Sequence, residues 1–187
     1  MSAIGHLRRA AVTAAAGFMA VSAASMALAA GNTADDAKPT DAPPSWDQVA
    51  SIRGAAERLG RLHRAKGANA AYQLIDNCYR THSLASTYGE GFEACITQDY
   101  LETHTLIQVY SRMPPEALKK AGVPSPQQLA DSMGQRISMA FSQYKKPQSY
   151  ADDLKKLVDE HGLPIFLALV FPEAVKAIEQ KKDQEKN

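Results

Sequence analysis

The sequence predicts an all-α protein, an irregular bundle of about five to seven helices that contains a disulfide-stapled helical hairpin. Apolar residues recur at helical spacing through most of the chain after residue 45, and no segment alternates convincingly between apolar and polar residues. The two cysteines, Cys78 and Cys95, lie on either side of a helix break. These observations favour packed helices over a sheet, with one covalent cross-link between neighbouring helices.

Residues 1–29 have the features of a secretory signal peptide. Arg8 and Arg9 form a basic start, residues 10–30 are small and apolar, and Ala27-Leu28-Ala29 supplies the small residues that signal peptidase requires. We therefore expect cleavage near Ala29 or Ala30 and a periplasmic or secreted location. An oxidising compartment of this kind favours disulfide formation.

The apolar stretch could instead anchor the chain in a membrane. It is rich in Ala and Ser, however, and poor in the Leu, Ile and Phe side chains that favour lipid insertion. No second hydrophobic run follows it, and no cysteine at the cleavage site offers a point for lipid attachment. We expect no stable membrane insertion after the leader is cleaved.

The rest of the chain divides into a linker, one domain and a tail. Residues 30–44 are rich in Gly, Asp, Thr and Pro and are expected to be a disordered linker. Residues 45–180 suit a single helical domain, and 181–187 form a charged tail. Cleavage would remove two arginines and leave a formal charge of −1, which argues against nucleic acid as a partner.

The first helices are predicted from capping residues and breaks. Ser45 and Gln48 have the spacing of a capping box and predict the start of a helix that Gly67 ends. A second helix is expected from about residue 68 to 82. After a Ser- and Gly-rich break at 83–91, a third helix is expected from about Phe92 to Met113, ended by two prolines.

The C-terminal half contains a second start signal and an unusual apolar run. Ser125 and Gln128 again form a capping box, which predicts a long helix ending before Pro147. A further helix is expected from Ser149 to Gly162. The run Ile165–Phe171 is apolar on all sides, a pattern typical of a helix in the middle of a bundle.

The positions of Cys78 and Cys95 predict a disulfide. Both lie on apolar helix faces, and they are equally distant from the middle of the break, so an antiparallel hairpin would bring them together. Two separate buried thiols remain an alternative. A zinc site of Cys78, His82, Cys95 and Asp99 is another, but a hairpin should place His82 and Asp99 in opposite directions from the cysteines. We expect no metal and no cofactor.

Asp99, His104 and His82 are the candidates for chemistry, and all three are weak. Asp99 falls on an apolar stripe, where a carboxylate needs a partner. Arg80, His82, His104 or a tyrosine hydroxyl could supply one. A structural ion pair is the plainer interpretation of Asp99, and an acid or base in a cleft is the functional one. No serine-hydrolase, HExxH or glycine-rich nucleotide motif occurs.

The function predicted from these observations is a non-catalytic binding or interaction module of the bacterial cell envelope. Its partner would be an envelope protein or a small apolar ligand held between helices. Seven tyrosines, several near the hairpin, suit either a ligand groove or the margin of a core. The alternatives are a small periplasmic hydrolase that uses Asp99 with a nearby His or Tyr, and a metal or stress-response protein that uses His82 and His104.

Overall fold

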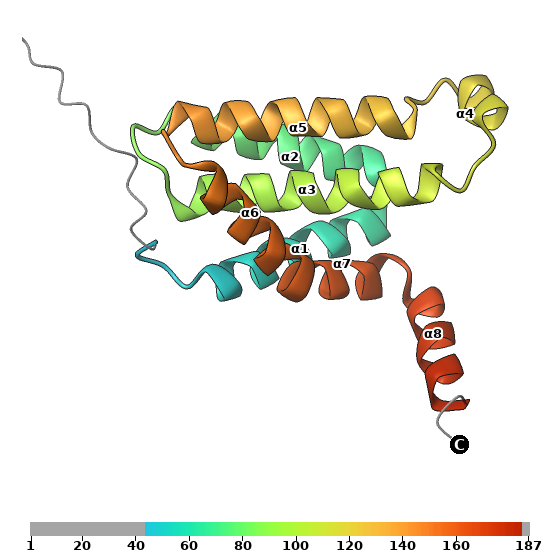
Figure 1. Cartoon of the computed structure of the whole chain (residues 1–187). Helices are drawn as coiled ribbons and strands as arrows, with labels where there is room; N and C mark the ends of the chain where they lie inside the picture. Colours follow the sequence, from blue (N-terminus) through green and yellow to red (C-terminus); the bar gives the residue numbers. More distant parts are fainter. Residues whose placement is uncertain (1–43, 185–187) are drawn as a thin grey trace, which may run out of the picture. The chain divides into compact units, whose positions relative to one another are not determined.

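The structure is a computed structural model that describes residues 44–184 (Figure 1). The predicted signal peptide, residues 30–43 of the predicted linker and residues 185–187 of the tail lie outside the described residues. No helix within residues 44–184 combines the length and the apolar character needed to cross a bilayer.

The described part of the chain is all-α, as predicted. Since α6, the π-helical turn η1 and α7 follow one another without a break, the described residues form seven continuous helical segments. In chain order they are α1 (Gln48–Lys66), α2 (Ala68–His82), α3 (Glu90–Tyr110), α4 (Pro115–Ala121), α5 (Pro126–Gln143), α6 (Gln148–Leu157) with η1 (Val158–Gly162) and α7 (Leu163–Val170), and α8 (Pro172–Gln184).

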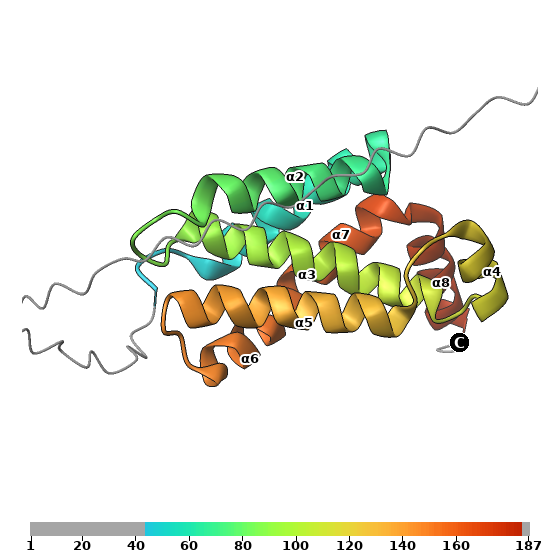
Figure 2. The same ribbon diagram turned by 90° about the horizontal axis from the view of Figure 1, so that it is seen from above.

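Helix α3 is the centre of the bundle. It contacts α1, α2 and α5, and it lies between α5 on one side and α1 and α2 on the other (Figure 1, Figure 2). Its buried residues run almost without interruption from Phe92 to Thr105, so all sides of the helix are covered. Seven of them are polar or charged. The core therefore contains polar groups that need partners.

The prediction that the apolar run Ile165–Phe171 occupies the middle of the bundle is wrong. Residues 165–170 of this run lie in α7, which packs along α1 at one side of the domain, and Phe171 follows the helix as its C-cap (Figure 1). Only Phe166 is fully buried, and Phe171 is 37% exposed. Because α3 already fills the centre, α7 covers α1 with one face and leaves part of the other accessible.

The two predicted helix starts had different outcomes. The capping box of Ser125 and Gln128 is confirmed, with reciprocal bonds of 3.2 and 2.8 Å between side chains and backbone. At α1, however, Asp47 is the cap, and its carboxylate accepts a bond from the Ala50 N–H at 3.0 Å. The Gln48 side chain turns inward to Glu93 instead.

Gly162 does not end a helix, contrary to the prediction. The chain continues through η1, where the Leu163 N–H bonds to the Val158 carbonyl five residues earlier. Pro164 follows at the start of α7 and has no N–H for a regular α-helical bond. The wider π turn accommodates this proline without breaking the segment.

The predicted disulfide between Cys78 and Cys95 is present, with Cα atoms 5.5 Å apart. It joins α2 to α3 as the two arms of a helical hairpin. The third helix starts at Glu90 and ends at Tyr110, a little earlier at each end than predicted.

Candidate functional site

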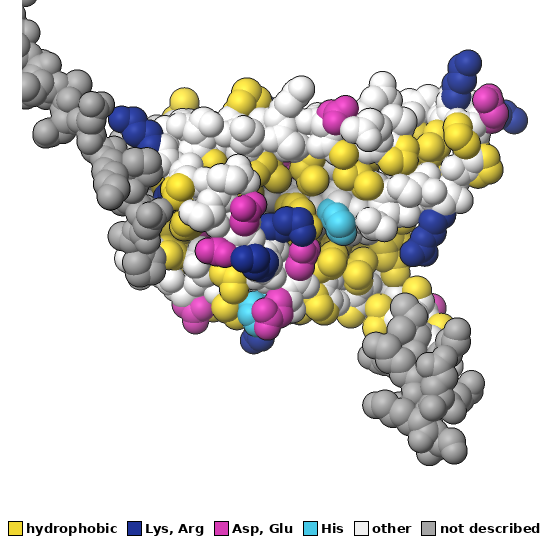
Figure 3. Space-filling model, in the orientation of Figure 1, with side chains coloured by type: hydrophobic (Ala, Val, Ile, Leu, Met, Phe, Trp, Pro, Cys, Tyr) yellow, Lys and Arg dark blue, Asp and Glu magenta, His cyan; other side chains and the backbone are white. Residues whose placement is uncertain are grey.

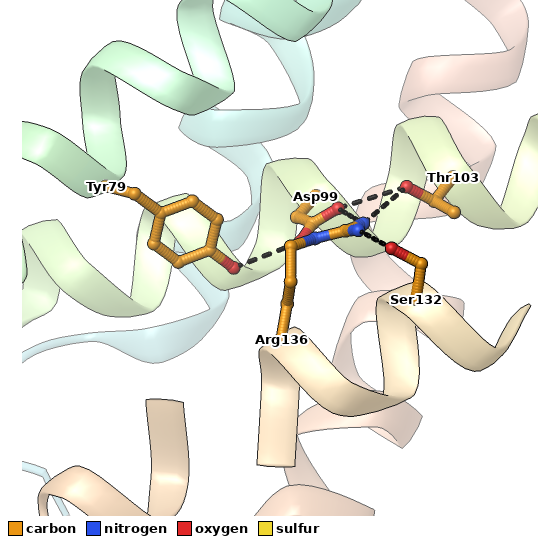
Figure 4. A network of polar contacts seen from close by, with 5 residues as sticks. All are labelled: Tyr79, Asp99, Thr103, Ser132 and Arg136. Carbon is orange, nitrogen blue, oxygen red and sulfur yellow. Dashed lines mark hydrogen bonds and ion pairs between the residues drawn. The ribbon is translucent and has the colours of Figure 1, made fainter. Parts of the chain in front are cut away.

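Asp99 lies in a polar network that joins three helices (Figure 4). Its carboxylate, 1% exposed, accepts bonds from Arg136 Nε at 2.8 Å and Arg136 Nη2 at 2.6 Å. It also accepts bonds from the Tyr79 hydroxyl at 3.2 Å and the Thr103 hydroxyl at 3.0 Å. Arg136 is held in turn by Ser132, which accepts a 2.6 Å bond from Nη1. Both oxygens of Asp99 are therefore occupied.

The electrostatics of this network are those of a structural ion pair. The bond to Asp99 raises the pKa of Arg136, so the guanidinium stays charged. Burial, followed by the charge of Asp99, raises the pKa of Tyr79, which keeps its proton and donates it to the carboxylate. Of the partners that the sequence offered for Asp99, which were Arg80, His82, His104 or a tyrosine hydroxyl, the tyrosine is found. Sequence reasoning did not identify Arg136, while Arg80 pairs with Asp76 on the surface.

The other two candidate residues lie in separate surroundings. The His104 ring stacks on Tyr100, with centroids 5.2 Å apart and ring planes at 13°. His82, at the end of α2, lies beside the cysteines. Among the described residues, neither histidine hydrogen-bonds to Asp99. The three candidates are thus not assembled into one catalytic site.

Glu93 is a second buried carboxylate of α3, and sequence reasoning missed it. It is 0% exposed and accepts bonds from Trp46 Nε1 at 3.1 Å, Gln48 Nε2 at 3.0 Å, and the hydroxyls of Tyr88 and Tyr150 at 3.2 and 2.5 Å. Four donors from separated parts of the chain surround this side chain. They fix the start of α1 against α3 and the start of α6, which is a structural role.

Glu102 is the third buried carboxylate of this helix. His63 Nδ1 on α1 lies 2.9 Å from Glu102 Oε2, while Oε1 has no hydrogen-bond partner among the described residues. Burial raises the pKa of Glu102, and the contact with His63 opposes that shift. The signal in the sequence was that Glu93 and Glu102 fall within a stretch of this helix that is rich in apolar side chains.

A groove of about 320 Å³ lies between α3, α5 and α6, and we call it the α3–α5–α6 groove. Figure 3 shows hydrophobic side chains exposed in the region between α5 and α6. The volume is at the lower end of the range for small-molecule sites. Its lining is mainly apolar and includes Ile96, Tyr100, Ile137, Phe141, Leu154 and Val158.

A buried hydroxyl at the groove has no protein partner within the described residues. Thr97 is 0% exposed as a residue, its hydroxyl finds no hydrogen-bond partner within the described residues, and it lines the groove. Tyr100, also in the lining, donates to Asp159 at 2.7 Å; burial and this bond raise the pKa of Tyr100 to about 12, so it stays protonated. A ligand in the groove would meet a mainly apolar wall that also carries polar side chains, among them Ser138, Ser142 and Gln148, with the buried Thr97 hydroxyl behind it.

Fold and groove together define a disulfide-stapled helical bundle that carries a small, mostly apolar groove between α3, α5 and α6. No family model matches the chain, and neither the curated proteins nor the solved structures contain a match. Its function must therefore be argued from its own residues.

Proposed function

We propose that the chain is an exported, non-catalytic binding protein of the bacterial cell envelope. Its α3–α5–α6 groove would take up a small apolar ligand that carries one hydrogen-bonding group. The observation that carries the proposal is the buried Thr97 hydroxyl, which has no partner among the described residues and belongs to a residue that lines a mainly apolar groove. A buried hydroxyl without a partner costs free energy, and a ligand that bonds to it would recover that cost.

A hydrolase is the weaker alternative because its best candidate residue is already engaged. A general base must reach the proton that it removes, and Asp99 has both oxygens bonded to protein groups, including a bidentate arginine. Asp99, Thr103 and Arg136 are also absent from the groove lining. We therefore assign to Asp99 and Arg136 the role of fixing α5 against α3, two of the three helices that form the groove.

The proposed location depends on the sequence of residues 1–29 and agrees with the disulfide. The Cys78–Cys95 bond is of a kind that persists in oxidising compartments. We expect the envelope protein or small molecule that binds here to meet the domain outside the cytoplasm.

Displacement of a fluorescent probe tests the groove. Anilinonaphthalene sulfonate is bound to the purified protein, and decanol is added as an apolar competitor with one hydroxyl. Gly134 lies on the groove wall, and a Cβ added there meets no atom within 4 Å. Gly134→Leu should therefore fill the groove without disturbing the fold, and it should abolish probe binding and displacement.

Two further variants make the test specific. Gly134→Ala is the matched control, because it changes the same helix position but adds only a methyl group, and it should retain most of the binding. Thr97→Val keeps the shape and removes the hydroxyl, and it should weaken decanol binding by roughly 2- to 10-fold, the loss of one hydrogen bond. Unchanged binding in Gly134→Leu would overturn the groove as the site.

A further inference from the structure

Two sulfurs and an imidazole meet at the hairpin, away from the groove. The potential ligand atoms of Cys78, His82 and Cys95 all lie within 4.8 Å of one another. His82 is one helical turn after Cys78 on α2, while Cys95 faces them from α3. The prediction that two of the four possible zinc ligands lie away from the cysteines holds for Asp99, which bonds to Arg136 instead. It does not hold for His82, which lies beside both sulfurs.

Gly91 provides the space that His82 occupies. A Cβ at position 91 would lie 2.4 Å from His82 Cε1 and 2.6 Å from Nδ1, so any other residue would displace the ring. The missing side chain allows the imidazole to lie directly against α3, next to Cys95. The Gly91 carbonyl also lies 3.1 Å from Cys95 Sγ, although a disulfide sulfur has no proton to donate to it.

Gln98 adds a polar group with no partner at the same place. It is 2% exposed, and its Oε1 makes no hydrogen bond to any described residue. Gln98, Cys78, His82 and Gly91 line one surface pocket, which gives the cluster access to solvent. A buried carbonyl oxygen without a donor is unfavourable unless water or a bound cation meets it.

We propose that reduction of the Cys78–Cys95 bond turns this cluster into a binding site for a thiophilic divalent cation such as Zn²⁺. The cation would be held by the two Sγ atoms and one ring nitrogen of His82, and Gln98 Oε1 or water would take the fourth position. Zinc favours four-coordinate sites with thiolate and imidazole ligands. This inference does not depend on the function proposed for the groove.

The redox step balances with an external dithiol as the reductant. The dithiol loses two electrons and two protons as it closes to its own disulfide, and these convert the Cys78–Cys95 bond into two thiols. Cation binding then displaces the two thiol protons into solvent. Two thiolates and one Zn²⁺ have no net charge together. The bound cation therefore adds no net positive charge to a pocket that Arg58 also lines.

The required movement is small. The Cα atoms of Cys78 and Cys95 are already 5.5 Å apart, and a tetrahedral zinc with bonds of about 2.3 Å places its two sulfurs about 3.8 Å apart. Rotation of the two cysteine side chains can supply this sulfur separation while α2 and α3 keep their positions. The oxidised protein offers no thiolate and should bind no zinc at this place.

Metal titration of oxidised and reduced protein tests the proposal. The full processed protein is reduced with dithiothreitol, freed of it by anaerobic gel filtration, and titrated with Zn²⁺ against a chromogenic chelator. Co²⁺ is the spectroscopic probe, because thiolate ligands give it a charge-transfer absorption. We expect one Zn²⁺ per reduced chain, none per oxidised chain, and a thiolate–cobalt band in the reduced form alone.

His82→Ala should weaken zinc binding at least about tenfold. Loss of a residue that only supports a metal ligand already lowers affinity by about 10- to 100-fold, and His82 would be a ligand itself. His104→Ala is the matched control, because it removes a histidine that stacks on Tyr100 away from the cysteines. It should bind zinc as tightly as the wild type. Gly91→Ala, which displaces the His82 ring, should reproduce the effect of His82→Ala.

Circular dichroism follows the fold during each titration. If the reduced chain loses helix, recovery of helix on addition of Zn²⁺ supports the site, and absence of recovery overturns it. Equal zinc binding by oxidised and reduced protein would also overturn it, as would wild-type affinity in both the His82→Ala and Gly91→Ala variants.

Discussion

At the scale of single residues, the domain depends on three buried carboxylates of α3, each of which meets side chains from other helices. Asp99 meets Arg136 of α5, Glu93 meets donors that include Tyr150 of α6, and Glu102 meets His63 of α1. A buried charge without a partner is far more costly than a buried pair. These contacts therefore fix which helix faces which side of α3.

The Asp99–Arg136 pair gives the first prediction. Arg136→Met should lower the free energy of unfolding by about 3 kcal/mol, because it leaves the Asp99 carboxylate buried without its cation. We take the lower end of the usual range because Arg136 is 36% exposed and water can reach its position. Urea denaturation monitored by circular dichroism measures the change.

The surface pair of Arg80 and Asp76 is the matched control for this experiment. Both side chains are mostly exposed, so Arg80→Met should cost less than about 1 kcal/mol. A cost for Arg136→Met no greater than that for Arg80→Met would show that Asp99 does not need its arginine.

Glu102 gives a prediction about pH. Burial raises its pKa in the folded protein, so the folded state holds this proton more tightly than the unfolded state does. The contribution of Glu102 to stability should therefore fall as the pH rises from the ordinary pKa of 4.5 through the raised value. Glu102→Gln cannot ionise and should lack this decline.

The measurement compares the unfolding free energies of wild type and Glu102→Gln across the acidic and neutral range. The advantage of the variant should grow as the pH rises. His63→Gln serves as a control for titration of the facing imidazole. A difference between wild type and Glu102→Gln that does not change with pH would contradict the prediction.

At the scale of helices, several local signals in the sequence predicted the structure correctly, although the capping box at Ser45 and the helix end at Gly162 did not. The capping box at Ser125, the break around residues 83–91 and the disulfide follow from neighbouring residues or from symmetry about one turn. The position of α7 could not be predicted in this way, because an apolar helix can be buried at the centre or can cover a neighbour. Arg136 lies 37 residues from Asp99, so no spacing rule connects them.

The polar character of α3 explains why its central position could not be predicted. A helix with Glu93, Asp99 and Glu102 has no wholly apolar surface, whereas the apolar run Ile165–Phe171 has the pattern expected of a central helix. Partners on other helices make the burial of α3 possible. Those partners could not be identified before the packing was known. The sequence favoured an apolar ligand between helices, but it could not identify α3, α5 and α6 as the helices that form the groove, because they meet only through packing.

Two helix glycines give a prediction about helix packing. At Gly60 of α1, an added Cβ would lie 2.9 Å from Leu169 Cδ1 and 3.0 Å from Leu169 Cβ, so α7 would have to move. Gly60→Ala should cost about 1–3 kcal/mol of stability despite the better helix propensity of alanine. Gly134→Ala, where no atom lies within 4 Å, should instead stabilise by roughly 0.5–1 kcal/mol.

Thermal and urea unfolding of the two alanine variants measure the difference directly. Since both glycines lie inside α-helices, the intrinsic gain from alanine is the same, and only the contact with α7 distinguishes them. Equal effects at both positions would show that α1 and α7 do not pack as closely as the structure indicates.

At the scale of the whole domain, the disulfide with His82 and the α3–α5–α6 groove lie in different parts of one bundle. The disulfide and His82 lie in the α2–α3 hairpin, and the groove lies on the other flank of α3, against α5 and α6 (Figure 2). Asp99 and Arg136 connect α3 to α5 and support one wall of that groove. A change in the redox state of the cysteines and the occupancy of the groove can therefore be measured separately in the same protein.

Export is the property of the whole chain on which the proposed function depends. Expressed with its first thirty residues in a bacterium with a periplasm, the protein should be recovered with Ala30 or Gly31 as its first residue and with Cys78 and Cys95 oxidised. The closed loop should contribute roughly 3 kcal/mol of stability. Replacing both cysteines by alanine should then lower the melting temperature by roughly 6–12 °C and leave the helical content at low temperature intact. Intact-mass analysis with and without thiol alkylation gives both the first residue and the number of free thiols. An uncut leader with two alkylated cysteines would place the protein in a reducing compartment and remove the basis for an envelope function.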